Sequence, residues 1–435
     1  MVVADEKAAL VTIFAVVACL PPVSGGGKAQ AMRRPDPLPP AIVLGVDTAI
    51  GLTVVRELWR FGVPVIAIGR SAYSVGGASR YCSRFVLRPT GLALAEWLPG
   101  LIAETGAATL FSISEGDLLE LSHLPQTIGA CRLLTPRKDK LDIVLDKMRT
   151  LAAARSVDIL TPESWQPRVG EALAERAAAL AYPLVLKWSD PPAMFARLET
   201  AGIAFEKAEY ARGPEELLLL LAKYAPLGDY PIVQTWVGGY GFGQMLMMAD
   251  GVARLRFQHR RVREFPASGG VSTLCATVPA NLHREQMAKS EALLAAIGWE
   301  GPAMVEYRHD PATGRYWLME INGRFWGSLP LASQAGACFA WEQYRHAVLR
   351  EPADPAPHYA ARRARYAIPD SKRLVQILRD ADIAGAGRPP FIRLREAGAY
   401  LAEFLNPRTG YYIWSWSDPK PLLRDMSGIL MKLRR

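Results

Sequence analysis

Short apolar runs alternate with helix-like segments in the first part of the chain, over residues 41–137. The stretch from Ala41 to Gly69 reads as a buried strand, a glycine-containing turn, an amphipathic helix and a second buried strand. Uninterrupted apolar strands joined by helices are typical of a parallel sheet. The spacing from Gly45 to Gly51 is not Gly-x-Gly-x-x-Gly, so the pattern assigns no nucleotide here. We expect an α/β domain.

The same alternation continues toward residue 137. We expect a strand over Arg84–Leu87, a helix over Leu92–Thr105 and a strand over Thr109–Ile113, followed by Glu115. Ligands of open α/β sheets bind beyond the carboxyl ends of the strands. Glu115 therefore either borders a substrate cleft or is an acidic residue of a surface loop.

After residue 138 the pattern becomes an α+β mixture. Helices are expected over Leu141–Arg155, Gly213–Tyr224 and Arg284–Ile297. Two strand-like runs, Met304–His309 and Tyr316–Asn322, flank the sequence Asp-Pro-Ala-Thr-Gly. Because proline and glycine are turn residues, these two runs predict a β-hairpin.

The predicted hairpin gathers oxygen-bearing side chains. With the turn centred on Thr313, Glu306 faces Glu320, and Asn322 projects from the same face because side chains alternate along a strand. Two carboxylates about 5 Å apart repel each other by roughly 3 kcal/mol at an effective dielectric of about 20. Mg²⁺, or Mn²⁺ in its place, would neutralise them, and Arg324 is placed to reach phosphates that share the metal. The alternative is an edge hairpin with solvated acids.

At this hairpin the chain resembles the ATP-grasp superfamily, in particular its carboxylate–amine ligase-like members. In that family a Glu, then Glu-x-Asn, then Arg hold magnesium and the ATP phosphates. The matching segments cover about Leu141 to Ala347, with a weaker likeness in the preceding domain. The resemblance implies an N-terminal extension, a Rossmann-like pre-ATP-grasp domain, a two-lobed ATP-grasp domain and a small C-terminal appendage, over residues 1–40, 41–137, 138–350 and 351–435.

Two lysines are the expected phosphate contacts. Lys147 follows Asp146 on the helix expected over Leu141–Arg155, and Lys187 closes the apolar strand that begins at Tyr182. A lysine on the inward side of a buried strand is costly unless an anion meets it. The resemblance implies that both lysines contact ATP. Many family members continue with a glycine-rich loop, whereas this chain continues with Trp-Ser-Asp-Pro-Pro-Ala-Met-Phe.

An apolar strand that enters a glycine-rich turn is the candidate adenine contact. Backbone groups at such a strand end can pair with an adenine edge, and Trp236 and Val237 offer a slot for the ring. The resemblance implies that adenine is met by Gln234, Thr235, Trp236 and Val237. A strand entering a glycine turn without a ligand fits the segment equally well.

Alternate residues of the predicted strand Val252–Arg263 share one face. On one of its two faces the side chains change from apolar to basic toward the end of the strand, at His259, Arg261 and Arg263. A basic end on an inward phase favours an anionic ligand. The segment Glu264–Ser272 then supplies a donor-rich loop that suits a phosphate or an acyl phosphate. A basic surface strand is the alternative, although similar patterns occur in the ATP-grasp family.

The resemblance implies a ligase that uses MgATP to activate a carboxylate as an acyl phosphate. An amine or a similar nucleophile, such as a thiol, then displaces the phosphate, and ADP and phosphate are released. The expected catalytic residues are Arg324, Arg261 and Arg263, which meet developing charge on oxygen. An ATP-dependent phosphotransferase, or an ATP-binding regulatory protein with little turnover, stays open as an alternative.

Charge and cysteine content narrow the partners. The 435 residues include 51 basic and 42 acidic side chains, a net charge of +9, which suits phosphorylated ligands or an anionic surface. No nucleic-acid motif accompanies this charge, so nucleic acid is not expected. Small-molecule carboxylate and nucleophile substrates are what the resemblance implies. Five cysteines without a Cys-x-x-Cys pair argue against a disulfide framework or a zinc site. We therefore expect a cytoplasmic protein, and self-association stays open.

Both ends of the chain leave alternatives open. The apolar run from Ala8 to Leu20 is too short to span a bilayer and is preceded by Asp5 and Glu6, so a signal, a peripheral anchor and a true start at Met32 all stay open. The basic amphipathic stretch over residues 419–435 suits an anionic membrane, a partner or packing on its own domain.

Overall fold

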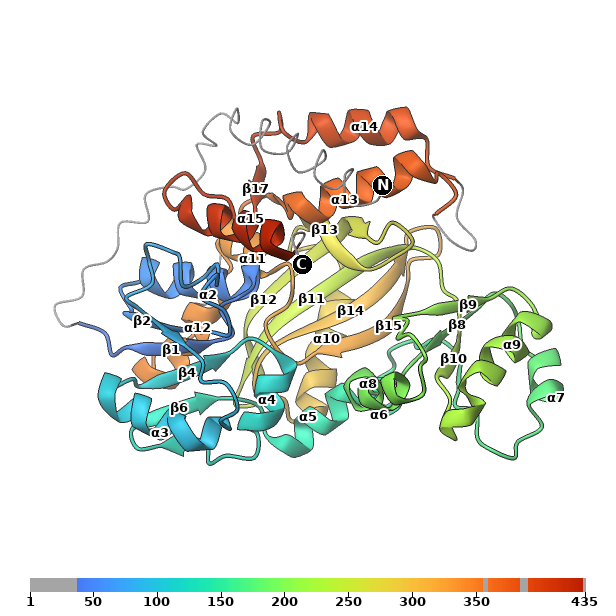
Figure 1. The fold of residues 1–435 in the computed structure, drawn as a ribbon, viewed down its shortest axis with the longest axis horizontal. Helices are drawn as coiled ribbons and strands as arrows, with labels where there is room; N and C mark the ends of the chain where they lie inside the picture. Colours follow the sequence, from blue (N-terminus) through green and yellow to red (C-terminus); the bar gives the residue numbers. More distant parts are fainter. Residues whose placement is uncertain (1–36, 355–358, 384–389, 433–435) are drawn as a thin grey trace.

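The computed structural model describes residues 37–354, 359–383 and 390–432, arranged as three sheets with their helices (Figure 1). The expected extension lies outside these ranges except for residues 37–40. No helix in the described ranges is both long enough and apolar enough to cross a membrane.

The N-terminal sheet has six strands in the order β3-β2-β1-β4-β6-β5 and is parallel except for β5. Its strands are β1 (Ala41–Leu44), β2 (Val65–Gly69), β3 (Arg84–Leu87), β4 (Thr109–Ser112), β5 (Thr127–Ile128) and β6 (Cys131–Leu134). Its helices are α2 (Ala49–Arg60), α3 (Leu94–Thr105) and α4 (Glu115–Leu121). The central strands β1 and β2 are buried along their whole length, and the predicted α/β domain is confirmed.

Helix α4 begins directly beyond the carboxyl end of β4. The Ser114 side chain caps it by accepting a hydrogen bond from the Asp117 amide at 3.1 Å. Glu115 is therefore the first residue of the helix and lies at the edge of the sheet where ligands of open α/β sheets bind.

Two short helices lead into the next sheet where one was expected. They are α5 (Lys138–Leu145) and α6 (Lys147–Arg155), and Asp146 between them has an extended backbone. Asp146 Oδ1 accepts a hydrogen bond from the Arg149 amide at 3.0 Å, as an N-terminal cap does. The prediction of a single helix was wrong because Asp146 starts a new one, which places Lys147 at its first position.

The second sheet forms a small lobe, drawn in green in Figure 1. Its antiparallel strands, in the order β7-β10-β8-β9, are β7 (Ser164–Trp165), β8 (Leu184–Lys187), β9 (Glu209–Ala211) and β10 (Ile232–Thr235). Its helices are α7 (Leu173–Ala178), α8 (Pro191–Thr200), α9 (Pro214–Tyr224) and the 3-10 turn η1 (Ala225–Leu227). The lobe has its own apolar core, which includes Trp165, Trp188 and Tyr224.

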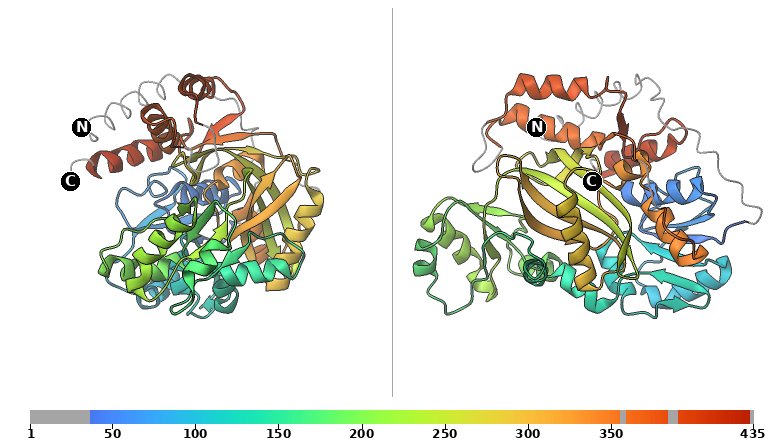
Figure 2. Two further views of the ribbon diagram at one scale, coloured as in Figure 1. Left: turned by 90° about the vertical axis from the view of Figure 1, so that its right-hand side faces the viewer. Right: turned by 180° about the vertical axis from the view of Figure 1, so that it is seen from behind.

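The third sheet has seven strands in the order β15-β14-β11-β12-β13-β16-β17. They are β11 (Tyr240–Ala249), β12 (Val252–Phe265), β13 (Val271–Thr277), β14 (Gly301–Asp310), β15 (Arg315–Asn322), β16 (Arg363–Arg365) and β17 (Thr409–Tyr411). Helix α10 (Arg284–Ile297) covers one face (Figure 2). Strands β14 and β15 pair antiparallel, so the predicted hairpin is confirmed.

Three helical segments join this sheet to the N-terminal domain. They are α11 (Leu329–Ala335), α12 (Phe339–Tyr344) and the π-helix η2 (Arg345–Leu349). Helices α11 and α12 contact α2, and one apolar core runs from the N-terminal sheet to the large sheet. The N-terminal sheet, which precedes the small lobe in the chain, and the large sheet, which follows it, are therefore joined by one apolar core.

The C-terminal appendage contains α13 (Ala367–Arg379), α14 (Arg393–Ala402) and α15 (Lys420–Lys432). Its strand β16 pairs with β13, and β17 pairs with β16, so the appendage continues the large sheet. Met426 of α15 is buried and Leu422 packs against the apolar core, which agrees with the expectation that the basic C-terminal stretch packs on its own domain.

Candidate active site

A register shift in the hairpin aligns its acidic residues. Next to the turn Asp310 pairs with Arg315, and a shift between Glu306 and Tyr307 then moves the pairing by one residue. Glu306 in β14 is paired with Glu320 in β15, and Asn322 lies two residues further along β15. Asn322 Nδ2 donates a hydrogen bond to Glu320 Oε1 at 3.2 Å. The three expected metal ligands therefore lie together on one face of the large sheet.

Arg261 crosses the sheet to reach these acids. Its guanidinium donates to Glu306, to Glu264 Oε1 at 3.1 Å and to the carbonyl oxygen of Gly270 at 3.1 Å. A Cβ atom on Gly241 would lie 2.6 Å from Arg261 Cδ, so only glycine in β11 leaves room for this side chain. Burial raises the pKa of Glu306, although the positive charge of Arg261 opposes that shift.

Three lysines from other parts of the chain act electrostatically on Glu320. Burial alone would raise the pKa of Glu320, but Lys147, Lys207 and Lys187 lower it below its ordinary value. Lys187 itself has a lowered pKa because of its burial and, to a smaller extent, because of Lys147 nearby. Lys147 Nζ donates to the Ser189 carbonyl oxygen at 3.4 Å, just beyond the end of β8. Positively charged side chains of α6 and of the small lobe therefore act on the acidic face of the hairpin.

Lys207 was not among the residues expected at the site. It is exposed and lies between α8 and β9, in the segment that follows Lys187 in the small lobe. A helix occupies part of that segment, with Asp190 Oδ1 capping it by accepting from the Ala193 amide at 3.2 Å. No pattern along the sequence marks Lys207, which lies two residues before β9 and outside regular structure.

Arg324 meets the N-terminal domain. Its Nε donates to Glu115 Oε1 at 2.9 Å, and its Nη1 donates to the Phe325 carbonyl oxygen at 3.1 Å. Glu115 is therefore paired with a residue expected at the site, and its place beside a substrate cleft stays a prediction. This ion pair links the carboxyl edge of the N-terminal sheet to the end of the hairpin.

His259 lies beside Arg261 in β12 but adds no positive charge. Its Nδ1 is 3.0 Å from Ser328 Oγ, and its buried Nε2 has no hydrogen-bond partner within the described part of the chain. Burial, with a smaller effect of Arg261, lowers the pKa of His259 to about 3. The imidazole is neutral at physiological pH, so the expectation of a basic His259 is corrected.

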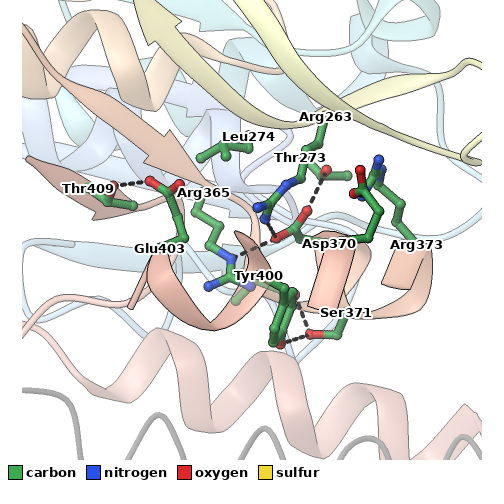
Figure 3. A network of polar contacts seen from close by, with 12 residues as sticks. Arg263, Thr273, Leu274, Arg365, Asp370, Ser371, Arg373, Tyr400, Glu403 and Thr409 are labelled. Atoms are coloured by element: carbon green, nitrogen blue, oxygen red, sulfur yellow. Dashed lines mark hydrogen bonds and ion pairs between the residues drawn. The ribbon is translucent and has the colours of Figure 1, made fainter. Parts of the chain in front are cut away.

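Arg263 is not at the site. Its Nη1 donates to Asp370 Oδ2 at 2.9 Å, and Arg365 Nε donates to the same oxygen at 2.8 Å, in a buried cluster at the appendage (Figure 3). The pairing of β12 with β13 has register shifts on both sides of Arg263. Simple alternation therefore fails there, and the expectation that Arg263 shares a catalytic face with Arg261 is corrected.

Gln234 has its side chain committed within the small lobe. It is buried in β10, and its Nε2 donates to Ser164 Oγ of β7 at 3.0 Å. This side chain ties two strands together, so any adenine contact at this position falls to the backbone.

The backbone amides after Gln234 are also partly used. The Thr235 amide donates to the Glu163 carbonyl oxygen at 2.9 Å, and the Trp236 amide donates to the Pro183 carbonyl oxygen at 3.1 Å. Both donors serve the fold of the lobe. The expected adenine contact stays a prediction, which now depends on the carbonyl oxygens of this segment, the partly buried Trp236 ring and Val237.

The arrangement fits a cation that shares its ligands with phosphate. In the described ranges, no group of three or more histidine, cysteine, aspartate or glutamate side chains is placed to hold a metal. Glu306 and Glu320 would therefore need Asn322 and non-protein oxygens to complete a shell, as Mg²⁺ commonly does with phosphates and water. The three lysines that act on Glu320 supply the positive charge that bound phosphates require.

Comparison with protein-family models and with characterised protein sequences gives no match. Solved structures give clear similarities. A carboxyaminoimidazole ribonucleotide synthetase in complex with ADP is 14% identical with a TM-score of 0.60, over 85% of this chain and 98% of that one. The biotin carboxylase domain of the Hydrogenobacter thermophilus 2-oxoglutarate carboxylase is 16% identical with a TM-score of 0.55, over 73% and 72%.

An L-amino acid ligase from Bacillus licheniformis is also similar, with 16% identity and a TM-score of 0.52, over 73% of this chain and 76% of that one. At these identities the similarity concerns the fold. A Rossmann-like sheet, a small antiparallel lobe and a large, mainly antiparallel sheet with a paired Glu306 and Glu320 follow one another along the chain. The chain has the ATP-grasp fold.

Proposed function

We propose that the chain is an MgATP-dependent ligase that activates a carboxylate as an acyl phosphate and couples it to an amine or a similar nucleophile. One observation carries the proposal. Glu306, Glu320 and Asn322 lie on one face of the large sheet, and lysines of the small lobe and of α6 act electrostatically on Glu320. Structural neighbours support it, because one was solved with MgADP and bicarbonate and another is named an L-amino acid ligase.

The roles of the residues follow from their charge and position. Glu306, Glu320 and Asn322 would hold Mg²⁺, which, when bound, neutralises phosphate charge. Lys147, Lys187 and Lys207 lie where phosphate oxygens would meet them, and they come from three separate segments of the chain. Binding of the polyphosphate would therefore draw the small lobe toward the large sheet.

The proposed reaction has two steps. A carboxylate oxygen of the substrate forms a bond to the γ-phosphorus, and the bond from that phosphorus to the ADP oxygen breaks. The nucleophile then bonds to the acyl carbon, phosphate leaves with the electron pair of the broken C–O bond, and the nucleophile loses its proton to solvent. Arg261 and Arg324 would stabilise charge on the oxygens, and losing one such donor typically costs about 10²–10³ in rate.

His259 is poorly suited to act as the general base of a phosphotransferase. Phosphoryl transfer to a hydroxyl is assisted by a general base, whose ideal pKa is near the working pH. His259 is the histidine nearest Arg261 in β12, and its pKa of about 3 makes it a weak base. A carboxylate substrate is already deprotonated and needs no such base.

A trapping experiment tests the proposal. The purified full chain is incubated with MgATP, hydroxylamine and each member of a panel of carboxylic and amino acids, and ADP and hydroxamate are measured. We expect one class of acid to give both products together, and Glu320→Ala to give neither. ADP release with a phosphorylated product that survives hydroxylamine would assign a phosphotransferase. MgATP binding without ADP release for any acid would favour a regulatory protein.

The substrates proposed are small molecules, in line with those named for the neighbours. The biotin carboxylase domain was solved as a dimer, and we include self-association of this chain in the proposal. Sedimentation velocity over a range of concentrations measures it, and a single monomeric species throughout would contradict it.

A further inference from the structure

Helix α14 turns its acidic side chains inward and its leucines outward. Glu396 Oε2 accepts a hydrogen bond from Arg373 Nη1 of α13 at 2.8 Å, and Tyr400 Oη is 2.6 Å from Ser371 Oγ. Just after the helix, Glu403 accepts from Arg363 Nε at 2.7 Å. These polar contacts, together with the Tyr400 and Phe404 rings packed on the Arg365 guanidinium, hold α14 and its C-terminal flank on the molecule.

The outward side carries an apolar stripe. Leu394, Leu401 and Leu405 are 87%, 58% and 82% exposed, and Gly398 between them is exposed as well. Their spacing of four, three and four residues places them on one side of the helix and of the turn that follows it. None of the residues of α14 is buried. We call Leu394, Gly398, Leu401 and Leu405 the leucine stripe.

The exposed charges on α14 itself and on its C-terminal flank are positive. Arg393, Arg395 and Arg408 are exposed on α14 and its C-terminal flank. The two acids of this segment, Glu396 and Glu403, are paired with arginines of the appendage and do not neutralise them. The outward side of α14 is therefore apolar and cationic, while the exposed Asp380 and Asp382 lie beside its N-terminal end, where the Ala381 carbonyl oxygen accepts from the Phe391 amide at 2.8 Å. Helix α14 lies at the outer margin of the molecule, beyond α13 (Figures 1 and 2).

We propose that the outer face of α14 docks on the surface of an anionic lipid bilayer. An apolar stripe flanked by arginines suits an interface in which leucines enter the boundary of the acyl chains and arginines meet headgroup phosphates. The net charge of +9 adds a general attraction to such a surface. This contact goes beyond the ligase activity and does not depend on it.

Charge also argues against a second copy of the chain as the occupant. A two-fold interface through this face would bring α14 against itself, because such interfaces use the same patch twice. The exposed Arg393 and Arg395 of one copy would then approach those of the other, with Glu396 and Glu403 turned away on both sides.

The test is co-sedimentation of the full chain with vesicles. One set contains phosphatidylcholine and phosphatidylglycerol, and the other contains phosphatidylcholine alone. We expect binding to the anionic vesicles, weakened at least about ten-fold by the double change Leu394→Ser and Leu401→Ser, because two leucines lose their apolar burial. A separate double change, Arg393→Gln and Arg395→Gln, should weaken binding by about the same factor and reduce its dependence on salt.

A matched control comes from the small lobe. Leu219 on α9 is 73% exposed, and Leu219→Ser should leave vesicle binding unchanged. Thermal melting of each variant shows that it folds, which is expected because the changed side chains point to solvent. Full binding by the Leu394→Ser and Leu401→Ser variant would overturn the proposal. Equal binding of the unchanged chain to uncharged vesicles would overturn it as well. A chain that binds no vesicle but self-associates, and loses that self-association on the leucine changes, would also overturn it.

Discussion

Arg261 and Arg263 are two residues apart in β12, yet their guanidinium groups bind acids in different parts of the molecule. Arg261 donates to Glu306 on the acidic face of the hairpin, whereas Arg263 donates to Asp370 in the appendage. Register shifts in the pairing of β12 with β13 accompany this separation. One arginine therefore belongs to the candidate site, and the other joins the appendage to the large sheet.

The Asp370 cluster should contribute strongly to stability. Asp370 is fully buried and accepts from Arg263, from Arg365 and from Thr273 Oγ1 at 3.0 Å. We expect Asp370→Ala to lower the free energy of unfolding by about 3–5 kcal/mol, because two buried arginines lose their shared acid. Urea unfolding followed by circular dichroism measures this. A change no larger than that of the exposed control Glu104→Ala would contradict it.

The acidic pair should control nucleotide binding. We expect Glu320→Ala to abolish calorimetric binding of MgATP and Glu306→Ala to weaken it at least about ten-fold, because each change removes a ligand from the cation. Both variants should melt as cooperatively as the unchanged chain. Unaltered titrations in both variants would show that the hairpin acids do not bind the metal.

Lys207 should contribute to phosphate binding although it is exposed. It acts on the charge of Glu320 from the small lobe, and with MgATP present it would meet the phosphates. We expect Lys207→Ala to raise the KM for ATP several-fold, with little change in melting temperature. Lys138→Ala, which removes a surface lysine paired with Asp142, is the control. Equal KM values for the two variants would exclude Lys207 from the site.

His259 should make the chain less stable in mild acid. Its pKa is lowered from an ordinary 6.5 to about 3, so the unfolded chain binds a proton that the folded chain refuses. Stability from this group is therefore complete above about pH 6.5 and falls as the pH drops toward 3. Between pH 7 and pH 5 the loss is about 2 kcal/mol.

The variant His259→Gln should show that much less loss of unfolding free energy over the same pH interval. His123→Gln, at an exposed histidine, should behave like the unchanged chain. Parallel pH dependence of the unchanged chain and His259→Gln would mean that His259 is protonated in the folded state.

Local patterns predicted those parts of the site that lie within one element. The turn residues predicted the hairpin, and Glu306 pairs with Glu320 as expected, but this pairing depends on a register shift beside Glu306 that the sequence did not indicate. The ion pair of Arg324 with Glu115 joins residues more than two hundred positions apart, and no period along the chain reports such a contact.

Two errors have local physical causes. Asp146 divides an expected helix because its side chain caps a new one. Short polar residues can either continue a helix or cap a new one, and the pattern of apolar residues does not distinguish the two. Arg263 departs from strict alternation because the strand pairing shifts its register around that residue. Lys207 lies outside regular structure, where periodicity carries no information about proximity to Glu320.

Because β16 pairs with β13, the C-terminal appendage cannot simply be separated from the rest of the chain or exchanged with that of another protein. A polypeptide that stopped at residue 350 would leave β13 with an open edge and would remove Asp370 from Arg263 and Thr273. Open edges with unpaired backbone groups promote aggregation. The last eighty or so residues are therefore not an exchangeable module. A chimaera that replaces them must supply both a strand for that edge and an acid for the buried arginine.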